Sequence, residues 1–355
     1  MALSSLSLAQ EGKVFLVTGS TDGIGLHTAK LLAAGGGSVI VHGRNELRVR
    51  DAVAEVERVA RGNGKVASYT RDFSSLQEVK RLGDDVKRDF ATIDVLVNNA
   101  GVYKEGKELS QDGFEMTYAV NVLAPFVLTS ALHNIVTSRV VNTASISAGH
   151  SVDLDNLNQE KGFSSHNAYS LSKLLDIILT FELAERLKEK PFTVNTLDPG
   201  TVNTKMLLAG WGPIGIPVES ADEFYVSTSP DLEGVSGEYF VGKRRTRCRV
   251  SRAPSPARLA FGRWPPSRGG PGTVCRQPPP SPESEGCSNP LQGSLPFAGG
   301  GGWVFTPPGD HSAEPFDPTW LWRRLVDRRA PAAAYDRGLR ETLWRLWEQQ
   351  TGVRF

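Results

Sequence analysis

The sequence predicts an α/β protein in which a single doubly wound parallel sheet carries helices on both faces. Short apolar runs alternate with longer amphipathic stretches from about residue 13 to residue 241, and a turn rich in glycine directly follows the first run. Such alternation implies repeated β-α-β units and a parallel sheet. Right-handed crossovers then leave the doubly wound sheet as the commonest topology. About 245 residues suffice for one such domain with a buried core.

The runs and the stretches between them predict the elements in chain order. Strands of a parallel sheet are nearly continuous apolar runs, whereas the intervening helices carry apolar residues at helical spacing. Either Ser74 or Ser75 can cap the third helix, and Pro191 ends the long fourth one. The predicted strands are residues 13–18, 38–42, 66–69, 93–98, 139–144, 192–197 and 237–241, and the predicted helices are residues 23–34, 46–61, 75–90 and 166–188.

The distribution of proline divides the chain into three parts. Of the 22 prolines, 15 lie between Cys248 and Ala330, as do all 3 cysteines. We therefore expect one domain over residues 1–247, a disordered, low-complexity Pro/Gly-rich insertion over residues 248–330 and an amphipathic helix in residues 331–355.

The predicted C-terminal helix has one apolar face, formed by Leu339, Leu343, Leu346 and Trp347. The simplest interpretation is that this face packs back on the domain, because an amphipathic helix buries its apolar stripe. A role for the aromatic residues in binding a cofactor or a partner is the alternative.

The insertion also allows more than one interpretation. Residues 243–268 contain nine basic and no acidic side chains, which is typical of an arm that attracts RNA or a membrane surface. Its prolines alternatively suggest a ligand for a partner domain. The composition favours an unstructured insertion without either role.

Composition excludes several classes of protein. With 40 Lys+Arg against 39 Asp+Glu and a net charge of +1, the chain lacks the basic excess of a nucleic-acid-binding protein. No apolar run is long enough for a membrane-spanning helix, and the first residues lack the features of a secretory signal, so we expect a cytoplasmic protein. The cysteines have no zinc-binding spacing, and no metal site is expected.

The turn after the first strand predicts nucleotide binding. Glycines at a strand-to-helix turn let backbone amides approach a pyrophosphate, and the helix that follows offers the positive end of its dipole. A tight turn that merely needs positive φ is the alternative, but the strands on either side favour a Rossmann-type cofactor site. The candidate residues are Gly19, Ser20, Thr21, Gly23, Ile24 and Gly25.

The end of the second strand predicts which nicotinamide cofactor is bound. A carboxylate there bonds the ribose hydroxyls of NAD, whereas this chain has Arg44 followed by Asn45. The guanidinium group can meet a 2′-phosphate, so NADP(H) is favoured. The alternative is a solvent-facing arginine that opens a helix.

A third group of residues predicts acid-base chemistry. The spacing of Tyr169 and Lys173 puts the phenol and the ammonium group on one helix face, one turn apart. A nearby cation favours the phenolate, so we expect it to lower the pKa of the phenol toward neutral pH. A surface pair is the alternative. Ser145, at the end of the fifth strand, would face the same helix.

Together these residues resemble the short-chain dehydrogenase/reductase family. The resemblance covers about residues 13–247, and residues 153–157, 166–169 and 181–187 are similar to its retinol-dehydrogenase-like branch. The motifs that carry it, in the family's order, are Thr18-Gly19-x-x-x-Gly23-Ile24-Gly25, Asn98-Asn99-Ala100-Gly101, Asn121, Ser145, Tyr169-x-x-x-Lys173 and Pro199-Gly200-x-x-x-Thr204.

The resemblance implies an NADP(H)-dependent oxidoreductase that moves a hydride between nicotinamide and a small or medium apolar carbonyl or alcohol. It implies that Tyr169 exchanges the proton and that Lys173 binds the nicotinamide ribose while tuning Tyr169. Ser145 would polarise the carbonyl, and Asn121 would hold a water of the proton relay. A non-catalytic NADP(H) sensor or scaffold that acts through a partner is the alternative, and a homodimer is compatible with the resemblance.

Further cofactor contacts follow from the same resemblance. Asp72 would meet adenine, Thr204 would reach the nicotinamide carboxamide, and Asn98 would tie the central sheet together. The remaining implied contacts are Asn99, Ala100 and Gly101 on the adenosine side, with Pro199 and Gly200 before Thr204.

The sequence departs from the family pattern at three places. Ala144 replaces the first serine of a usual pair, but Ser145 holds the reacting position. The segment between Thr204 and Phe224 is short, which argues against retinol itself as substrate. The insertion separates the domain from its terminal helix. Our hypothesis is that it is translated non-coding sequence, whose deletion over residues 248–328 leaves fold and activity intact.

Overall fold

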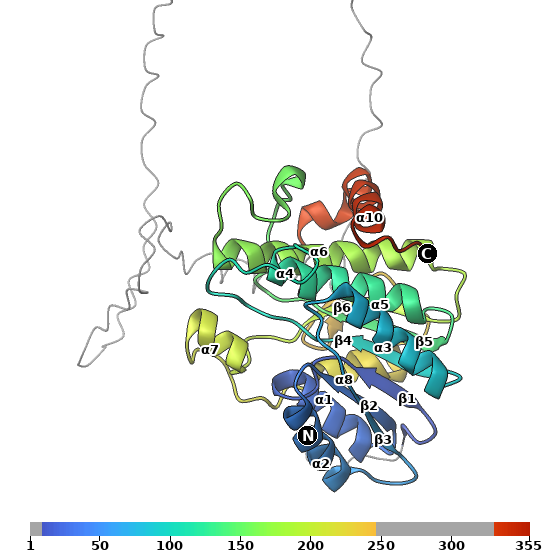
Figure 1. Ribbon diagram of the computed structural model, residues 1–355. Coiled ribbons are helices and arrows are strands. Elements are labelled where there is room, and N and C mark those ends of the chain that lie inside the picture. Colours follow the sequence, from blue (N-terminus) through green and yellow to red (C-terminus); the bar gives the residue numbers. More distant parts are fainter. Residues whose placement is uncertain (1–8, 246–329) are drawn as a thin grey trace, which may run out of the picture. The chain divides into compact units, whose positions relative to one another are not determined.

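The computed structural model describes residues 9–245 and 330–355 (Figure 1). Their strands form one sheet with the order β3-β2-β1-β4-β5-β6-β7-β8. All neighbouring pairs are parallel except β7 and β8. The strands are β1 Val14–Val17, β2 Ser38–Gly43, β3 Val66–Thr70, β4 Ile93–Asn98, β5 Val136–Thr143, β6 Thr193–Asp198, β7 Tyr239–Val241 and β8 Arg244–Arg245.

Strand β1 lies between β2 and β4, so the direction of winding reverses there. In open α/β sheets, ligands bind in the crevice beyond the carboxyl ends of the strands at such a switch point. The predicted fold class, a doubly wound parallel sheet of the Rossmann type, is therefore confirmed.

Two layers of helices enclose the sheet. One apolar core joins the strands to α1, α2 and α8, and the other joins them to α3, α5, α6 and α10. The helices are α1 Gly23–Ala34, α2 Glu46–Val59, α3 Leu76–Asp89, α4 Met116–Tyr118, α5 Ala124–Leu132, α6 Ser165–Arg186, α7 Lys205–Trp211, α8 Asp222–Thr228 and α10 Arg337–Thr351.

Side-chain caps explain where two of the predicted helices begin. The carbonyl oxygen of the Asn45 side chain accepts a hydrogen bond from the backbone of Arg48 at 3.0 Å, which starts α2. The hydroxyl of Ser75 caps α3 in the same way, so it is Ser75 rather than Ser74 that acts as the cap. Both caps satisfy amides that the first helical turn leaves without partners.

The region between β4 and β5 differs most from the prediction. It contains α4, a π-helical turn over Ala119–Leu123 and α5, where no helix was predicted, and β5 begins at Val136, three residues early. Nearly all of α5 is buried, so it has no polar face and shows no amphipathic period. A helix that is apolar all round cannot be told from a buried strand by periodicity.

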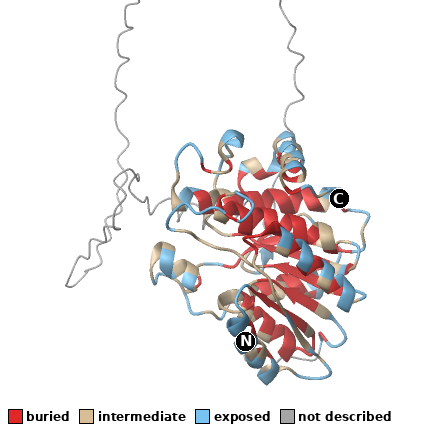
Figure 2. Ribbon diagram, viewed as in Figure 1, coloured by how far each residue is buried: buried red, intermediate tan, exposed pale blue. Residues whose placement is uncertain are grey.

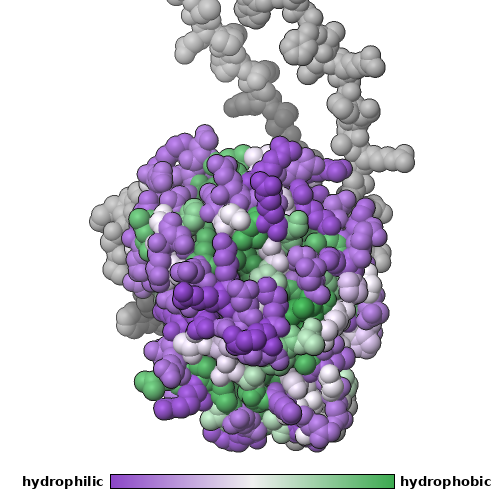
Figure 3. All heavy atoms as spheres, turned by 45° about the vertical axis from the view of Figure 1, so that its right-hand side comes forward, coloured by the Kyte–Doolittle hydropathy of each residue, from purple (hydrophilic) through white to green (hydrophobic). Residues whose placement is uncertain are grey.

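Burial follows the layered architecture (Figure 2). The central strands and the middle of α6 are buried, while the outer turns of the surface helices are exposed. On the face shown in Figure 3, hydrophilic side chains predominate and hydrophobic ones reach the surface between them. Such scattered apolar exposure is ordinary for a folded protein.

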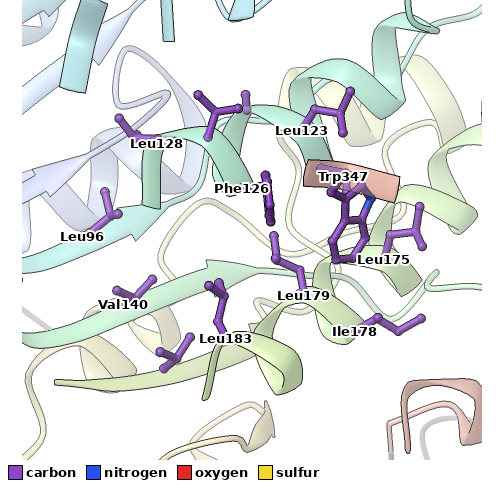
Figure 4. Packing of buried hydrophobic residues seen from close by; sticks show 14 of the residues in the cluster. Leu96, Leu123, Phe126, Leu128, Val140, Leu175, Ile178, Leu179, Leu183 and Trp347 are labelled. Atoms are coloured by element: carbon purple, nitrogen blue, oxygen red, sulfur yellow. The ribbon is translucent and has the colours of Figure 1, made fainter. Parts of the chain in front are cut away.

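The chain's last helix, α10, packs on the outer side of α5 and α6 (Figure 4). Leu343, Trp344 and Trp347 are buried, and the Trp347 ring lies 5.8 Å from the ring of Phe126. A left-handed Gly352 ends the helix. The predicted insertion lies outside the described residues except for Ala330.

Candidate active site

The predicted site residues gather at the carboxyl ends of β1, β4, β5 and β6. The hydroxyl of Thr18, just after β1, accepts hydrogen bonds from the backbone amides of Asn99 and Ala100, each at 3.0 Å. The Asn99 amide group donates to the Thr18 carbonyl at 2.8 Å. These bonds clamp the loop after β1 to the loop after β4 and fix the floor of the crevice.

The glycine turn above this floor tolerates no side chains at two positions. A Cβ at Gly19 would lie 2.7 Å from the Ala100 Cα, and a Cβ at Gly25 would lie 2.3 Å from the Asn99 amide nitrogen. Gly19 and Gly23 also have positive φ, of 64° and 55°. The turn thus exposes backbone at its glycines next to the N-terminus of α1, where the Asp22 side chain caps the helix, and this glycine cradle suits a pyrophosphate.

Residues after β2 and β3 lie beside this cradle. Arg44 is exposed. Asn45 caps α2 through its side chain, and the Asp72 carboxylate accepts from the Ser74 amide at 3.0 Å. Asn45 and Asp72 therefore have structural bonds, and their predicted contacts to the cofactor stay predictions.

Sequence reasoning missed His42, which is buried beneath the cradle. Its Nδ1 accepts a hydrogen bond from the Gly19 amide at 3.3 Å, and its Nε2 donates to the Arg71 carbonyl at 3.0 Å. The backbone amide of His42 donates to the Ser20 hydroxyl at 3.0 Å. Burial lowers the pKa of His42 to about 4, so the ring is neutral. The only sequence signal was a polar residue inside an apolar strand.

We expect His42 to make folding stability fall in mild acid. Folding lowers the pKa of His42 from 6.5 to about 4. Between these pH values the imidazole is therefore protonated in the unfolded chain and neutral in the folded chain. This contribution is absent above pH 6.5 and grows to about 3 kcal/mol of destabilisation as the pH falls to 4. Urea unfolding at stepped pH measures it.

The matched variants for that experiment are His42→Asn and His133→Asn. The free energy of unfolding of His42→Asn should vary less with pH than that of the wild type. The half-buried His133 has a smaller downward pKa shift, so its variant should keep most of the slope. Equal slopes in the wild type and His42→Asn would contradict the assignment.

The predicted catalytic side chains meet on the buried face of α6. Tyr169 and Lys173 are 7% and 4% exposed, and the Lys173 Nζ lies 5.8 Å from the centre of the phenol ring. Ser145, two residues beyond β5, lies close enough to the phenol to lower its pKa. The surface-pair alternative is therefore wrong, because both side chains are inside.

The predicted pKa of Tyr169 needs a correction. Lys173 and Ser145 do lower the pKa of the phenol, as expected, but burial raises it more, so the net shift is upward. A buried phenolate loses its hydration, and one cation at this separation does not offset the loss. Tyr169 is thus held protonated in the protein by itself.

Lys173 is fixed by two partners besides its proximity to Tyr169. Its ammonium group donates to the Thr143 carbonyl at 2.7 Å and to the Asp176 carboxylate at 2.9 Å. The Thr143 hydroxyl in turn donates to Glu223 at 2.6 Å. The carboxyl pKa values of both Asp176 and Glu223 are raised by burial and held down by neighbouring donors.

Asn121 lies in the π-helical turn between α4 and α5. Its amide nitrogen donates to the Val102 carbonyl at 3.1 Å and to the Ser172 hydroxyl at 2.9 Å, and its oxygen accepts from the Val102 amide. Both polar atoms of the side chain therefore have protein partners, and the oxygen keeps one lone pair free for a further donor. π-Helical turns often occur at functional sites, and the predicted role of Asn121 in holding a water stays a prediction.

Asn98 occupies the position predicted for it in the centre of the sheet. Its amide donates to the Asn142 side chain at 2.8 Å and to the Thr129 hydroxyl at 3.2 Å. These bonds link β4, β5 and α5 beneath the site.

The loop after β6 reaches across the crevice. Gly200 has a φ of 80°, and its amide donates to the Asp198 carboxylate at 3.0 Å. Thr204 caps α7, and its methyl group would lie 3.1 Å from a Cβ at Gly23. Pro199, Gly200 and Thr204 thus bring the loop and α7 to the glycine cradle.

An aromatic wall, which sequence reasoning also missed, lines the crevice next to the phenol. It consists of Tyr103, His166 and Trp211, whose rings pack against one another at 5.1 to 5.5 Å between centroids. The Trp211 ring lies 5.4 Å and the Tyr103 ring 5.8 Å from the Tyr169 ring. The wall joins three distant chain segments, so no local pattern predicts it.

This fold and crevice define a dinucleotide-binding oxidoreductase. A family model described as short chain dehydrogenase matches residues 13–209. The chain therefore belongs to the short-chain dehydrogenase/reductase family, in its retinol-dehydrogenase-like branch, and the predicted resemblance is confirmed. Members of this family use a nicotinamide cofactor.

Three similar proteins illustrate the relationship. Human retinol dehydrogenase 14 is 33% identical, over 64% of this chain and 78% of its own. Human polyprenol dehydrogenase is 33% identical, over 66% and 78%. A short chain dehydrogenase from Burkholderia cenocepacia, solved in complex with NADP, is 26% identical with a TM-score of 0.54, over 66% of this chain and 97% of its own.

The described part of the chain lacks two further features. Residues 9–245 and 330–355 include no helix with the length and apolarity to cross a membrane. The same residues contain no group of three or more His, Cys, Asp or Glu side chains arranged to hold a metal ion.

Proposed function

We propose that this protein is an NADP(H)-dependent oxidoreductase that interconverts a small or medium apolar carbonyl compound and its alcohol. The observation that carries the proposal is that the buried Tyr169 and Lys173 lie together with Ser145 at the carboxyl edge of the sheet. A protein that only binds a cofactor needs no protonated phenol fixed by a hydroxyl and an ammonium group.

The residues of the crevice have separate tasks in this proposal. The bound nicotinamide supplies or accepts the hydride. Tyr169, held protonated by burial, gives its proton to the carbonyl oxygen during reduction and recovers it in the reverse direction. Ser145 donates a hydrogen bond to the same oxygen and aligns it. Lys173 binds the ribose and stabilises the phenolate that remains.

The glycine cradle supports the cofactor assignment. Its glycines Gly19, Gly23 and Gly25, at the N-terminus of α1, leave backbone open to a pyrophosphate. The exposed Arg44 at the end of β2 suits a 2′-phosphate. The similar Burkholderia cenocepacia enzyme was solved with NADP, which supports the same choice.

We expect Arg44→Ala to weaken NADPH binding by about ten- to a hundredfold and to leave NADH binding nearly unchanged, because NADH has no 2′-phosphate. Nicotinamide fluorescence titration measures both affinities. Arg50→Ala, which removes an exposed arginine of α2 that pairs with Asp51, is the control. An equal fall in both affinities would show that Arg44 does not meet the 2′-phosphate.

The aromatic wall supports an apolar substrate. Tyr103 and Trp211, with His166 packed against both, present ring faces and edges next to the phenol, where the reacting carbon would lie. Aromatic surface favours apolar and planar groups over charged ones. The short α7 covers less than a long lipophilic segment would, which favours a small or medium substrate.

Single-turnover reduction tests the proposed function. The protein would be mixed with one equivalent of NADPH and then with each member of a panel of aliphatic and aromatic aldehydes, and nicotinamide absorbance would be followed. We expect turnover with apolar members and none with charged ones. Tight NADPH binding without turnover of any member would favour the sensor or scaffold alternative.

A cytoplasmic location and a homodimer also stay proposals. Cell fractionation and the mass of the purified protein in solution test them.

A further inference from the structure

Asp176 lies on the buried face of α6 with Tyr169 and Lys173, and it has no role in the proposed mechanism. Its carboxylate lies 2.9 Å from the Lys173 ammonium group, and the two side chains are 5% and 6% exposed. Tyr169, Lys173 and Asp176 follow one another at helical spacing, so they lie along one stripe of α6. The surrounding residues Leu174 to Ile178 are otherwise apolar.

Burial of this kind is unfavourable for a lone ammonium group. Taking a charge out of water is strongly unfavourable, and a buried lysine without a counterion commonly loses its proton instead. The Thr143 carbonyl accepts one hydrogen bond from Lys173, but a carbonyl dipole offsets only part of the cost. Lys173 must keep its charge to bind the ribose and to stabilise the phenolate.

We propose that Asp176 is a positioning residue that keeps the buried Lys173 protonated and fixed against the end of β5. The effect of Asp176 on catalysis rests on the proposed function. Its effect on the ionisation of Lys173 in the cofactor-free protein does not.

The other ionisable groups near Lys173 are less able to fill this role. Tyr169, on α6, is held neutral by burial. Glu223, on α8, accepts a hydrogen bond from the Thr143 hydroxyl and acts on Lys173 only as a more distant charge. Asp198, at the end of β6, acts on Tyr169. Asp176 accepts a hydrogen bond directly from the ammonium group, at 2.9 Å.

The balance of effects on Lys173 agrees with this assignment. Burial lowers the pKa of Lys173, and Asp176 is the largest influence that raises it, so that the net shift is upward. The same contact acts on the carboxylate. Burial raises the pKa of Asp176, and Lys173 is the largest influence that lowers it.

The decisive experiment compares Asp176→Asn with the wild type in the full chain without cofactor. Lysine labelled with 13C at Cε reports ionisation by its chemical shift, and Lys173→Met identifies the signal. We expect the Lys173 midpoint to fall by about one pH unit or more, because the amide keeps the size and an oxygen but removes the charge. An unchanged midpoint would overturn the proposal.

Two variants separate this effect from a loss of structure. Asp176→Glu keeps the charge and should restore most of the midpoint. Glu182→Gln removes another buried carboxylate of α6, which pairs with Arg186 and Arg340, and should leave the Lys173 midpoint unchanged. If Asp176→Asn does not fold, Asp176→Ser replaces it, and the same fall in the midpoint is expected.

The catalytic consequence is a second, separate measurement. The assay uses NADPH and an aldehyde that the wild type reduces. On the alkaline limb of the pH profile, kcat/KM of Asp176→Asn should begin to fall at a lower pH than kcat/KM of the wild type, by the same shift as the Lys173 midpoint. Absence of any wild-type turnover would refute the proposed function, while the shift in Lys173 ionisation would still stand. A lower kcat without a displaced pH profile would show that Asp176 is only structural.

Discussion

Tyr169→Phe is expected to lower kcat for carbonyl reduction by about a hundred- to ten-thousandfold, the usual contribution of a positioned general acid. The change removes only the hydroxyl, so the ring remains packed on Trp211 and Tyr103. NADPH affinity should stay near the wild-type value, because the phenol oxygen carries the proton and does not hold the pyrophosphate. Stopped-flow kinetics and fluorescence titration measure the two quantities.

Tyr69→Phe is the matched control for this experiment. It removes the same atom from a tyrosine of β3 whose hydroxyl donates to the exposed Asp89 at the end of α3. Its kcat should equal that of the wild type. A Tyr169→Phe enzyme that keeps full kcat would remove the basis of the oxidoreductase proposal.

The turn, the helix and the strands that build the site could be predicted, because each is determined by residues close together in the sequence. Gly19 and Gly25 are required by close backbone approaches on either side of one turn, and the spacing of Tyr169 and Lys173 is set by one helix. The central strands were recognisable as apolar runs, because a sheet covered on both faces buries the side chains of its central strands on both sides.

The features that were missed depend on tertiary contacts. In the sequence, His42 is only one polar residue in an apolar strand. Its hydrogen bonds to Gly19 and Arg71, which the fold brings next to it, show that it supports the cradle. The aromatic wall joins Tyr103 to Trp211, more than a hundred residues later. The net pKa of Tyr169 depended on burial, which spacing alone does not give.

The C-terminal helix is expected to contribute strongly to stability, although residues outside the described ranges separate it from β8. Trp347→Ala should lower the free energy of unfolding by about 3 to 5 kcal/mol, the usual cost of emptying a large buried aromatic site. Trp347 is fully buried among Phe126, Leu175 and Leu179 (Figure 4). Urea unfolding followed by circular dichroism measures the change.

Gln349→Ala is the control on the same helix, because Gln349 is exposed and good helix-forming residues replace one another there at little cost. Its unfolding free energy should stay within about 0.5 kcal/mol of the wild type. Hydrogen bonds from Tyr118 to Gln350 and from Lys80 to the Thr351 carbonyl also tie α10 to α4 and α3. If the free energy of unfolding of Trp347→Ala equals that of the wild type, α10 does not contribute to the stability of the core.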